Sequence, residues 1–169
     1  MLVAAIMALA LTSCGQGSTP PVTIYGPPIT VATNLPTPIP NSPDLADVIE
    51  VSVSGTPGTY LVSVTLASPD TGCDSYADWW EVISQGGELL YRRVLLHSHV
   101  DEQPFTRSRG PIDIQPSDTV IVRAHMSTTG YGGTALQGTA ADGFSPADVS
   151  AEFAASLENQ APLPHDCDF

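Results

Sequence analysis

The stretch VIEVSVSGTPGTYLVSVTLA, residues 48–67, indicates the fold class of this chain of 169 residues. Apolar and polar residues alternate on both sides of Gly55-Thr56-Pro57-Gly58, and this period of two places successive side chains on opposite faces of a β-strand. Glycine and proline favour tight turns. The stretch therefore predicts a β-hairpin, with an apolar face formed by Ile49, Val51, Val53, Tyr60, Val62, Val64 and Leu66.

Further strands are predicted downstream of this hairpin. Residues 73–84, 88–100 and 118–126 contain alternating apolar residues, and Ile112 and Ile114 suggest a short edge strand between prolines. Five or six strands joined mostly by hairpins are typical of an antiparallel β-sandwich, so we expect a mainly β fold. The strand pattern resembles that of immunoglobulin and fibronectin type III domains, without a motif specific to either family.

The part of the chain beyond residue 130 carries a weaker signal. Glycines from Gly130 to Gly143 predict a loop. Ser145-Pro146-Ala147-Asp148 then combines a helix N-cap with a proline at the first helical position, which predicts a short helix over residues 146–158. The apolar residues that follow recur at intervals of four, as on a helix, but also fit a strand, which is the alternative: Val149, Phe153 and Leu157.

An apolar segment, LVAAIMALALTS at residues 2–13, lies near the start of the chain. As a helix it would be only about 18 Å long, whereas a bilayer core requires about 30 Å. Its length fits the apolar region of a secretory signal. A buried apolar helix is the alternative interpretation.

The segment ends in Leu11-Thr12-Ser13-Cys14, which resembles the lipobox of bacterial lipoproteins. The resemblance implies that residues 1–13 are a signal peptide and that Cys14 is acylated. It also implies that the protein is exported and held by lipid in the bacterial cell envelope, at the outer membrane or the cell surface.

A tether is predicted between this signal and the folded domain. Residues 14–45 contain eight of the 16 prolines and show neither a helical nor an alternating period. Proline-rich segments favour the polyproline II conformation, which at about 3.1 Å per residue would give a reach of up to about 95 Å. We therefore expect residues 14–45 to form a stalk and residues 46–169 to form the β-sandwich domain. A docking site for a proline-binding domain is the alternative.

The charge of the chain narrows the classes of partner. The chain has 18 acidic residues and five basic ones, so that the formal net charge is −13. All five basic residues are arginines. This excess opposes binding to nucleic acid, and no basic stretch is present to bind anionic lipid headgroups. The expected partners are the membrane, through the lipid anchor, and an unknown protein or other component of the envelope.

The chain contains three cysteines, an odd number for an exported protein. If Cys14 is acylated, as the lipobox resemblance implies, Cys73 and Cys167 remain as a pair in an oxidising compartment. We therefore expect a disulfide between Cys73 and Cys167. Two free thiols are the alternative.

One cluster of residues suggests metal chemistry, His97-Ser98-His99-Val100-Asp101-Glu102. Two histidines at i and i+2 of a strand point the same way and can share a transition metal, with His125 as a third candidate ligand. The cluster resembles the start of the metallo-β-lactamase motif His-x-His-x-Asp-His, but Glu102 stands in place of the last histidine. Cupins and copper-zinc superoxide dismutases also contain a His-x-His pair, and the remaining ligands of both families are missing here.

We therefore expect His97 and His99 to be structural or peripheral, expect His125 not to approach both, and expect no cofactor. The sequence lacks a Gly-x-Ser-x-Gly elbow, a His-Glu-x-x-His pair and a calcium loop, so an enzyme is not expected. A cell-envelope lipoprotein with a role in binding, adhesion or assembly is the leading hypothesis. A metal-binding envelope protein or metalloenzyme that uses the three histidines is the rival.

Two adjacent tryptophans, Trp79 and Trp80, lie in the predicted strand at residues 73–84. Because neighbouring side chains of a strand point to opposite faces, one indole is expected in the core of the sandwich. The other is then available to support a second layer or a ligand.

Overall fold

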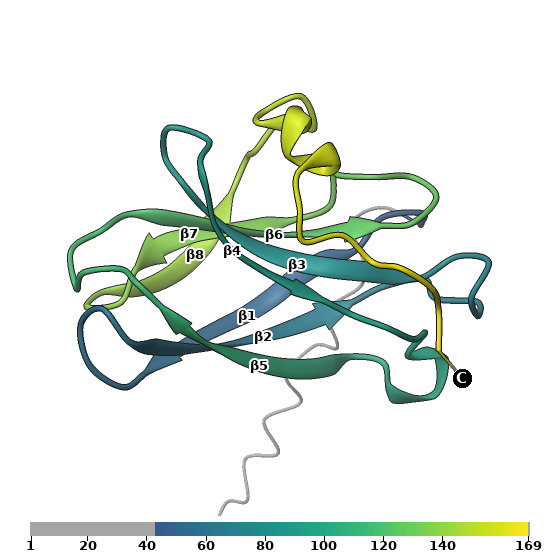
Figure 1. Cartoon of the computed structure of the whole chain (residues 1–169), viewed down its shortest axis with the longest axis horizontal. Helices are drawn as coiled ribbons and strands as arrows, with labels where there is room; N and C mark the ends of the chain where they lie inside the picture. Colours follow the sequence, from purple (N-terminus) through teal and green to yellow (C-terminus); the bar gives the residue numbers. More distant parts are fainter. Residues whose placement is uncertain (1–42, 169) are drawn as a thin grey trace, which may run out of the picture. The chain divides into compact units, whose positions relative to one another are not determined.

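The computed structural model describes residues 43–168, so that the predictions for the signal peptide, Cys14 and most of the stalk concern residues outside the described part. Two antiparallel sheets form a β-sandwich, as the sequence predicts (Figure 1). The smaller sheet has the order β1-β2-β5, with β1 at Asp47–Ser54, β2 at Tyr60–Ala67 and β5 at Phe105–Ile112. The larger sheet has the order β4-β3-β6-β7-β8, with β3 at Ala77–Ser84, β4 at Leu89–Val94, β6 at Val120–Met126, β7 at Ala135–Thr139 and β8 at Gly143–Ala147.

The hairpin predicted from residues 48–67 is formed by β1 and β2, which pair with Val51 opposite Val64. A β-bulge between Val48 and Glu50 changes which side chain reaches the core. Val48 is fully buried, whereas Ile49 is only half-buried. The prediction that Ile49 lies on the buried face is therefore wrong by one residue.

The main core lies between the two sheets. Trp80 is fully buried there, together with valines of β2, β3 and β6. Trp79 is also buried, but on the opposite face of the larger sheet, where its ring stacks on His125. The C-terminal segment runs across this face (Figure 1). A second apolar cluster on that face combines Ile83 and Ile121 with Leu157 of the C-terminal segment. The two tryptophans thus divide between core and second layer, as the alternation predicts.

The predicted loop from Gly130 to Gly143 is wrong, because β7 and β8 form a hairpin there. The small residues have a physical role in this hairpin. A Cβ atom at Gly138 would lie 1.9 Å from the carbonyl oxygen of Gly143 in the paired strand. Only glycine permits so close an approach of the two backbones.

The predicted helix over residues 146–158 is also absent. Pro146 and Ala147 end β8, turns follow, and a short 3-10 helix, η2, spans Ala155–Asn159. Proline is tolerated in β8 because this strand lies at the edge of its sheet. A second 3-10 helix, η1, spans Val100–Glu102. No helix within residues 43–168 is long and apolar enough to cross a membrane.

The long strand predicted at residues 88–100 ends early, at Val94. His97 and His99 therefore lie in the irregular segment between β4 and η1, not on a strand. The predicted edge strand around Ile112 is longer than expected and begins at Phe105, where β5 pairs with β2.

Candidate functional site

The outer face of the larger sheet carries a buried ion cluster that contains two of the five arginines. Glu81 is completely buried, and each of its carboxylate oxygens accepts a hydrogen bond from one guanidinium group. Arg92 Nε lies 2.9 Å from Oε2 of Glu81, and Arg123 Nε lies 2.9 Å from Oε1. The two cations and one anion leave the cluster with positive charge that must be stabilised by further acceptors.

Backbone carbonyl groups of the C-terminal segment provide those acceptors. Arg92 donates hydrogen bonds to the carbonyl oxygens of Leu157, Gln160 and Pro162. Arg123 donates to the carbonyl oxygens of Phe153 and Ala154. The ion cluster therefore fixes residues 153–162 across the outer face, and both arginines are fully occupied.

His125 belongs to this outer layer. Its ring stacks on Trp79 at a centroid distance of 3.7 Å, and its Nδ1 atom lies 2.7 Å from Oδ1 of Asp78. Burial raises the pKa of Asp78, while the hydrogen bond with His125 opposes that shift. Burial, followed by the charge of Glu81, raises the pKa of Tyr131, beside this ring, to about 12.

The three candidate metal ligands do not come together as a set. His97 and His99 are neighbours, with ring centroids 4.5 Å apart, but His125 is engaged by Asp78 and Trp79 in the outer layer. Within residues 43–168, no group of three or more histidine, cysteine, aspartate or glutamate side chains is arranged to hold a metal ion.

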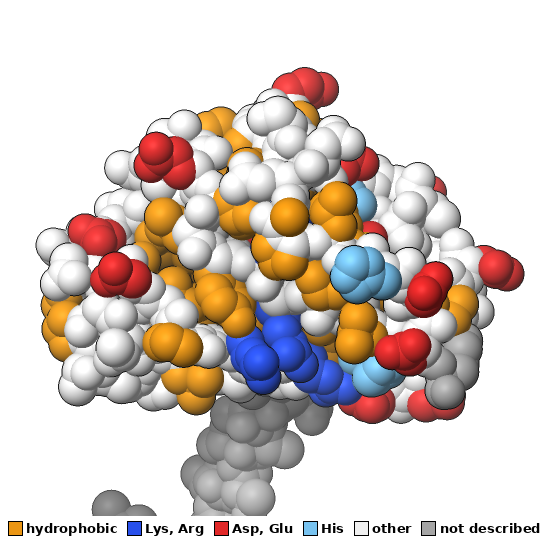
Figure 2. All heavy atoms as spheres, viewed as in Figure 1, with side chains coloured by type: hydrophobic (Ala, Val, Ile, Leu, Met, Phe, Trp, Pro, Cys, Tyr) orange, Lys and Arg blue, Asp and Glu red, His pale blue; other side chains and the backbone are white. Residues whose placement is uncertain are grey.

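The remaining three arginines lie on the two edge strands that border one open side of the sandwich. Arg93 on β4 is paired opposite Trp80, and Arg107 and Arg109 on β5 are paired opposite Val64 and Val62. Residues paired directly across two strands share a face, so these arginines are on the same faces as the core residues. Figure 2 shows basic side chains gathered on this side of the molecule, next to apolar and histidine side chains.

A cavity of about 130 Å³ lies at this edge, hereafter the edge cavity. It combines two guanidinium groups and two imidazoles with aliphatic walls. Among its lining residues there is no carboxylate, in a chain with 18 acidic side chains. The lining residues are Arg93, Val94, Leu95, Leu96, His97, His99 and Arg107.

A column of stacked side chains forms one wall of the edge cavity. The guanidinium carbon of Arg107 lies 5.3 Å from the ring centroid of Phe105. Phe105 stacks on His99 at a centroid distance of 3.9 Å, and His97 lies against the other side of His99. Such cation–π and stacking contacts hold the rings in defined positions. Arg107 also forms an ion pair with the half-exposed Glu102, at 2.7 Å.

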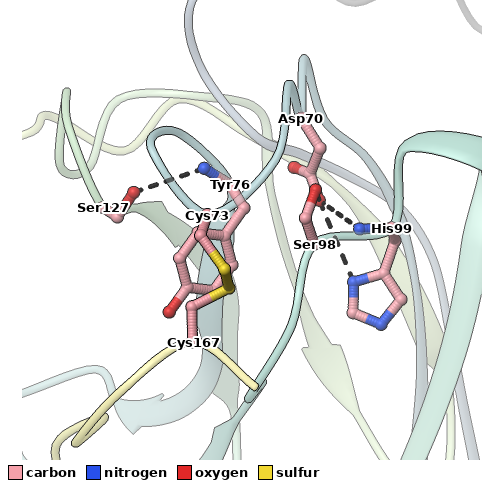
Figure 3. Close-up of a disulfide and its surroundings, with 7 residues drawn as sticks. All are labelled: Asp70, Cys73, Tyr76, Ser98, His99, Ser127 and Cys167. Atoms are coloured by element: carbon pink, nitrogen blue, oxygen red, sulfur yellow. Dashed lines mark hydrogen bonds and ion pairs between the residues drawn. A yellow bond between two sulfur atoms is a disulfide. The ribbon is translucent and has the colours of Figure 1, made fainter. Parts of the chain in front are cut away.

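Asp70 holds the backbone of His99 in place, as Figure 3 shows. Its Oδ2 atom accepts a hydrogen bond of 2.7 Å from the backbone N–H of His99, and its Oδ1 atom accepts bonds from Ser68 and from the N–H of Ala77. Nδ1 of His99 lies 3.9 Å from Oδ2 of Asp70, too far for a hydrogen bond, so neither ring nitrogen has a hydrogen-bond partner within the described residues although the side chain is buried. Buried polar groups usually have a partner, so this ring is a candidate ligand-binding group.

The protonation state of His99 follows from its surroundings. Burial lowers the pKa of His99 to about 4, and the positive charges of Arg107 and His97 act in the same direction. Asp70 and Glu102 oppose this shift without cancelling it. At neutral pH the ring is therefore uncharged, with one N–H donor and one acceptor nitrogen.

The pKa of His99 predicts a pH dependence of stability. An unfolded histidine gains its proton near pH 6.5, whereas folded His99 gains it only near pH 4, so stability falls as the pH falls through this interval. Between pH 7 and pH 5 this group should cost about 2 kcal/mol. Urea unfolding of the wild type and of His99→Gln at both pH values measures the difference. His165→Gln, in the exposed tail, is the control; an equal pH response of all three proteins would contradict the expectation.

The disulfide joins Cys73 in the loop before β3 to Cys167 in the C-terminal tail, with Cα atoms 5.6 Å apart (Figure 3). Next to it, the N–H of Asp168 donates a hydrogen bond of 2.6 Å to the carbonyl oxygen of Leu96. The tail is thereby held against the segment that contains His97 and His99.

Sequence reasoning missed both the ion cluster and the arginines of the edge cavity. A signal for the first was present, because Glu81 interrupts the apolar run Trp79-Trp80-Glu81-Val82-Ile83 in a central strand. A charge at such a position requires a buried partner. Arg107 and Arg109 lie between Pro104 and Pro111. Because prolines argue against a strand, the strand that carries both arginines was not predicted from the sequence.

A protein of Halomicrobium mukohataei with the name "Putative lipoprotein" is 45% identical to this chain over 93 residues. The match covers 54% of this chain and 45% of that relative, so the chain spans less than half of the relative's length. No protein family and no solved structure match the chain.

Proposed function

We propose that this chain is a lipid-anchored protein of the cell envelope whose β-sandwich domain has a binding role. The proposal is carried by the 45% identity to a relative named as a lipoprotein. Two further features support it. Leu11-Thr12-Ser13-Cys14 provides a cysteine in the context that lipoprotein signals use, and the disulfide between Cys73 and Cys167 suits an oxidising compartment.

The proposed arrangement assigns a role to each part of the chain. Residues 1–13 direct export, Cys14 carries the lipid, and residues 14–45 form a stalk that separates the domain at residues 46–169 from the membrane. The edge cavity supports a binding role for that domain, since Nε of Arg93 and both ring nitrogens of His99 have no hydrogen-bond partner within the described residues. Adhesion and assembly are the forms of binding that suit a tethered domain.

Lipidation predicts a specific labelling result. A labelled fatty acid supplied to growing cells should enter the protein, and Cys14→Ser should abolish the label, because acylation requires the thiol of that residue. Acyl chains contribute about 0.8 kcal/mol per buried CH₂, so wild-type protein should also stay with the membrane in a high-salt wash. Ser18→Ala, in the stalk, is the control and should be labelled normally. Release of the wild type by salt, or unchanged labelling of Cys14→Ser, would contradict the proposal.

A further inference from the structure

Four of the five arginines fall into two groups, one buried in the ion cluster and one lining the edge cavity. Arg92 and Arg123 are buried with Glu81, and every guanidinium nitrogen of both has an acceptor. Arg93 and Arg107 line the edge cavity, whose lining contains no carboxylate. Arg107 is also paired with the half-exposed Glu102, whereas Arg93 forms no ion pair within the described residues, so part of the positive charge at this edge of a strongly acidic chain is available to a partner.

Two buried polar groups in the lining of this cavity lack hydrogen-bond partners within residues 43–168. One is Nε of Arg93, a donor on β4, and the other is the imidazole of His99, whose two nitrogens are both unbonded. They come from separate segments and meet at the same cavity. An unsatisfied buried donor costs about 1–3 kcal/mol, so a bound acceptor would repay that cost.

We propose that the edge cavity binds an oxyanion group, a carboxylate or a phosphate, that accepts hydrogen bonds from Arg93 and His99 and is paired with the charge of Arg107. The inference rests on the proposed binding role of the domain and specifies the chemistry of its ligand. In the envelope the group could belong to an acidic sugar or to a phosphate ester.

The composition of the cavity selects an anion over other ligands. An ionised carboxylate or a phosphate offers acceptors to these donors, and the planar guanidinium fork matches two oxygens at once. A cation would be repelled by both arginines. The volume of about 130 Å³ would hold about four water molecules, which is enough for one oxyanion group but not for a large apolar ligand.

Isothermal titration calorimetry on the full chain carrying Cys14→Ser tests the inference, because this variant removes lipidation from the measurement. Inorganic phosphate and glucuronate are the two probes, with ionic strength held constant by chloride. At least one probe should bind with a Kd of about 1 mM or tighter. The preferred probe identifies the source as a phosphate ester or an acidic sugar.

Variants separate the cavity from general electrostatics. Arg93→Gln and Arg107→Gln should each weaken binding about tenfold, since each removes a charge-assisted contact. Arg109→Gln removes the same charge from an exposed position outside the lining and should weaken binding by less than about threefold. Arg93→Lys, which keeps the charge but loses the planar fork, should also bind more weakly than the wild type. Unfolding midpoints of all variants show whether each remains folded.

Two outcomes would overturn the inference. In the first outcome, neither probe binds at concentrations up to about 10 mM. In the second, Arg109→Gln weakens binding as much as the two cavity variants do. The arginines would then act as inward-pointing charges that keep edge strands from pairing with other chains. Such a failure would leave the labelling of Cys14 unaffected, so it is distinguishable from a failure of the proposed lipid anchor.

Discussion

Glu81→Ala is expected to lower the free energy of unfolding by about 3–5 kcal/mol, because it leaves two buried guanidinium groups without their anion. Glu81 is fully buried, and its two oxygens serve Arg92 and Arg123 separately. Removing the carboxylate therefore affects both cations at once. Urea unfolding followed by tryptophan fluorescence measures the change, since Trp79 lies 4.5 Å from the guanidinium of Arg92.

Two further variants define the cause of that loss. Glu88→Ala removes an exposed carboxylate from the turn between β3 and β4 and should change stability by no more than about 0.5 kcal/mol. Glu81→Gln keeps the volume of the side chain but not its charge, so it should be destabilising despite unchanged packing. If Glu81→Gln were as stable as the wild type, packing and not charge would account for the role of Glu81.

The contrast between Glu81 and Arg93 shows how a strand pattern can hide charges. Both residues lie in strands that the sequence predicts, although with longer bounds, and each is on a face where the pattern calls for an apolar residue. The buried partners of Glu81 are 11 and 42 residues away in the chain. The alternation of apolar and polar residues depends only on the local geometry of a strand. An ion cluster whose members come from three strands therefore shows no regular spacing in the sequence.

The C-terminal third was predicted poorly for a different reason. Helix signals at Ser145-Pro146-Ala147-Asp148 are local, whereas the pairing of β8 with β7 depends on tertiary contacts that favour a strand. Residues beyond Ala147 form turns and the short helix η2, where the carbonyl groups of Phe153, Ala154 and Leu157 accept hydrogen bonds from Arg123 and Arg92. The first hairpin had no such competitor, and for it the turn residues and the alternation agree.

The candidate site was predictable in part. The sequence pointed to His97 and His99 as candidate metal ligands, and these two residues do lie together. What distinguishes the edge cavity is the proximity of Arg93 and Arg107, which belong to different sheets. Only the packing of one sheet on the other brings these two residues to one cavity.

Removal of the disulfide, by Cys73→Ala with Cys167→Ala, is expected to destabilise the domain by up to about 4–5 kcal/mol. The sequence separation of the two cysteines is 94 residues, and the chain-entropy model assigns a cost of that size to closing such a loop. Urea unfolding with and without reductant measures the effect. Reductant should lower the stability of the wild type and leave the double variant unchanged; an equal response of both proteins would contradict the expectation.

The same double variant separates the two anchors of the C-terminal segment. The ion cluster holds residues 153–162 through their carbonyl groups, and the disulfide holds the last residues next to Leu96. Loss of the disulfide should therefore expose the tail to carboxypeptidase only as far as the part bound by Arg92. Combining it with Glu81→Ala should release the whole segment and uncover Trp79. Because both changes act on one segment, their effects on stability should be non-additive, with a coupling energy of at least about 0.5 kcal/mol. Strict additivity would mean that the two anchors act independently.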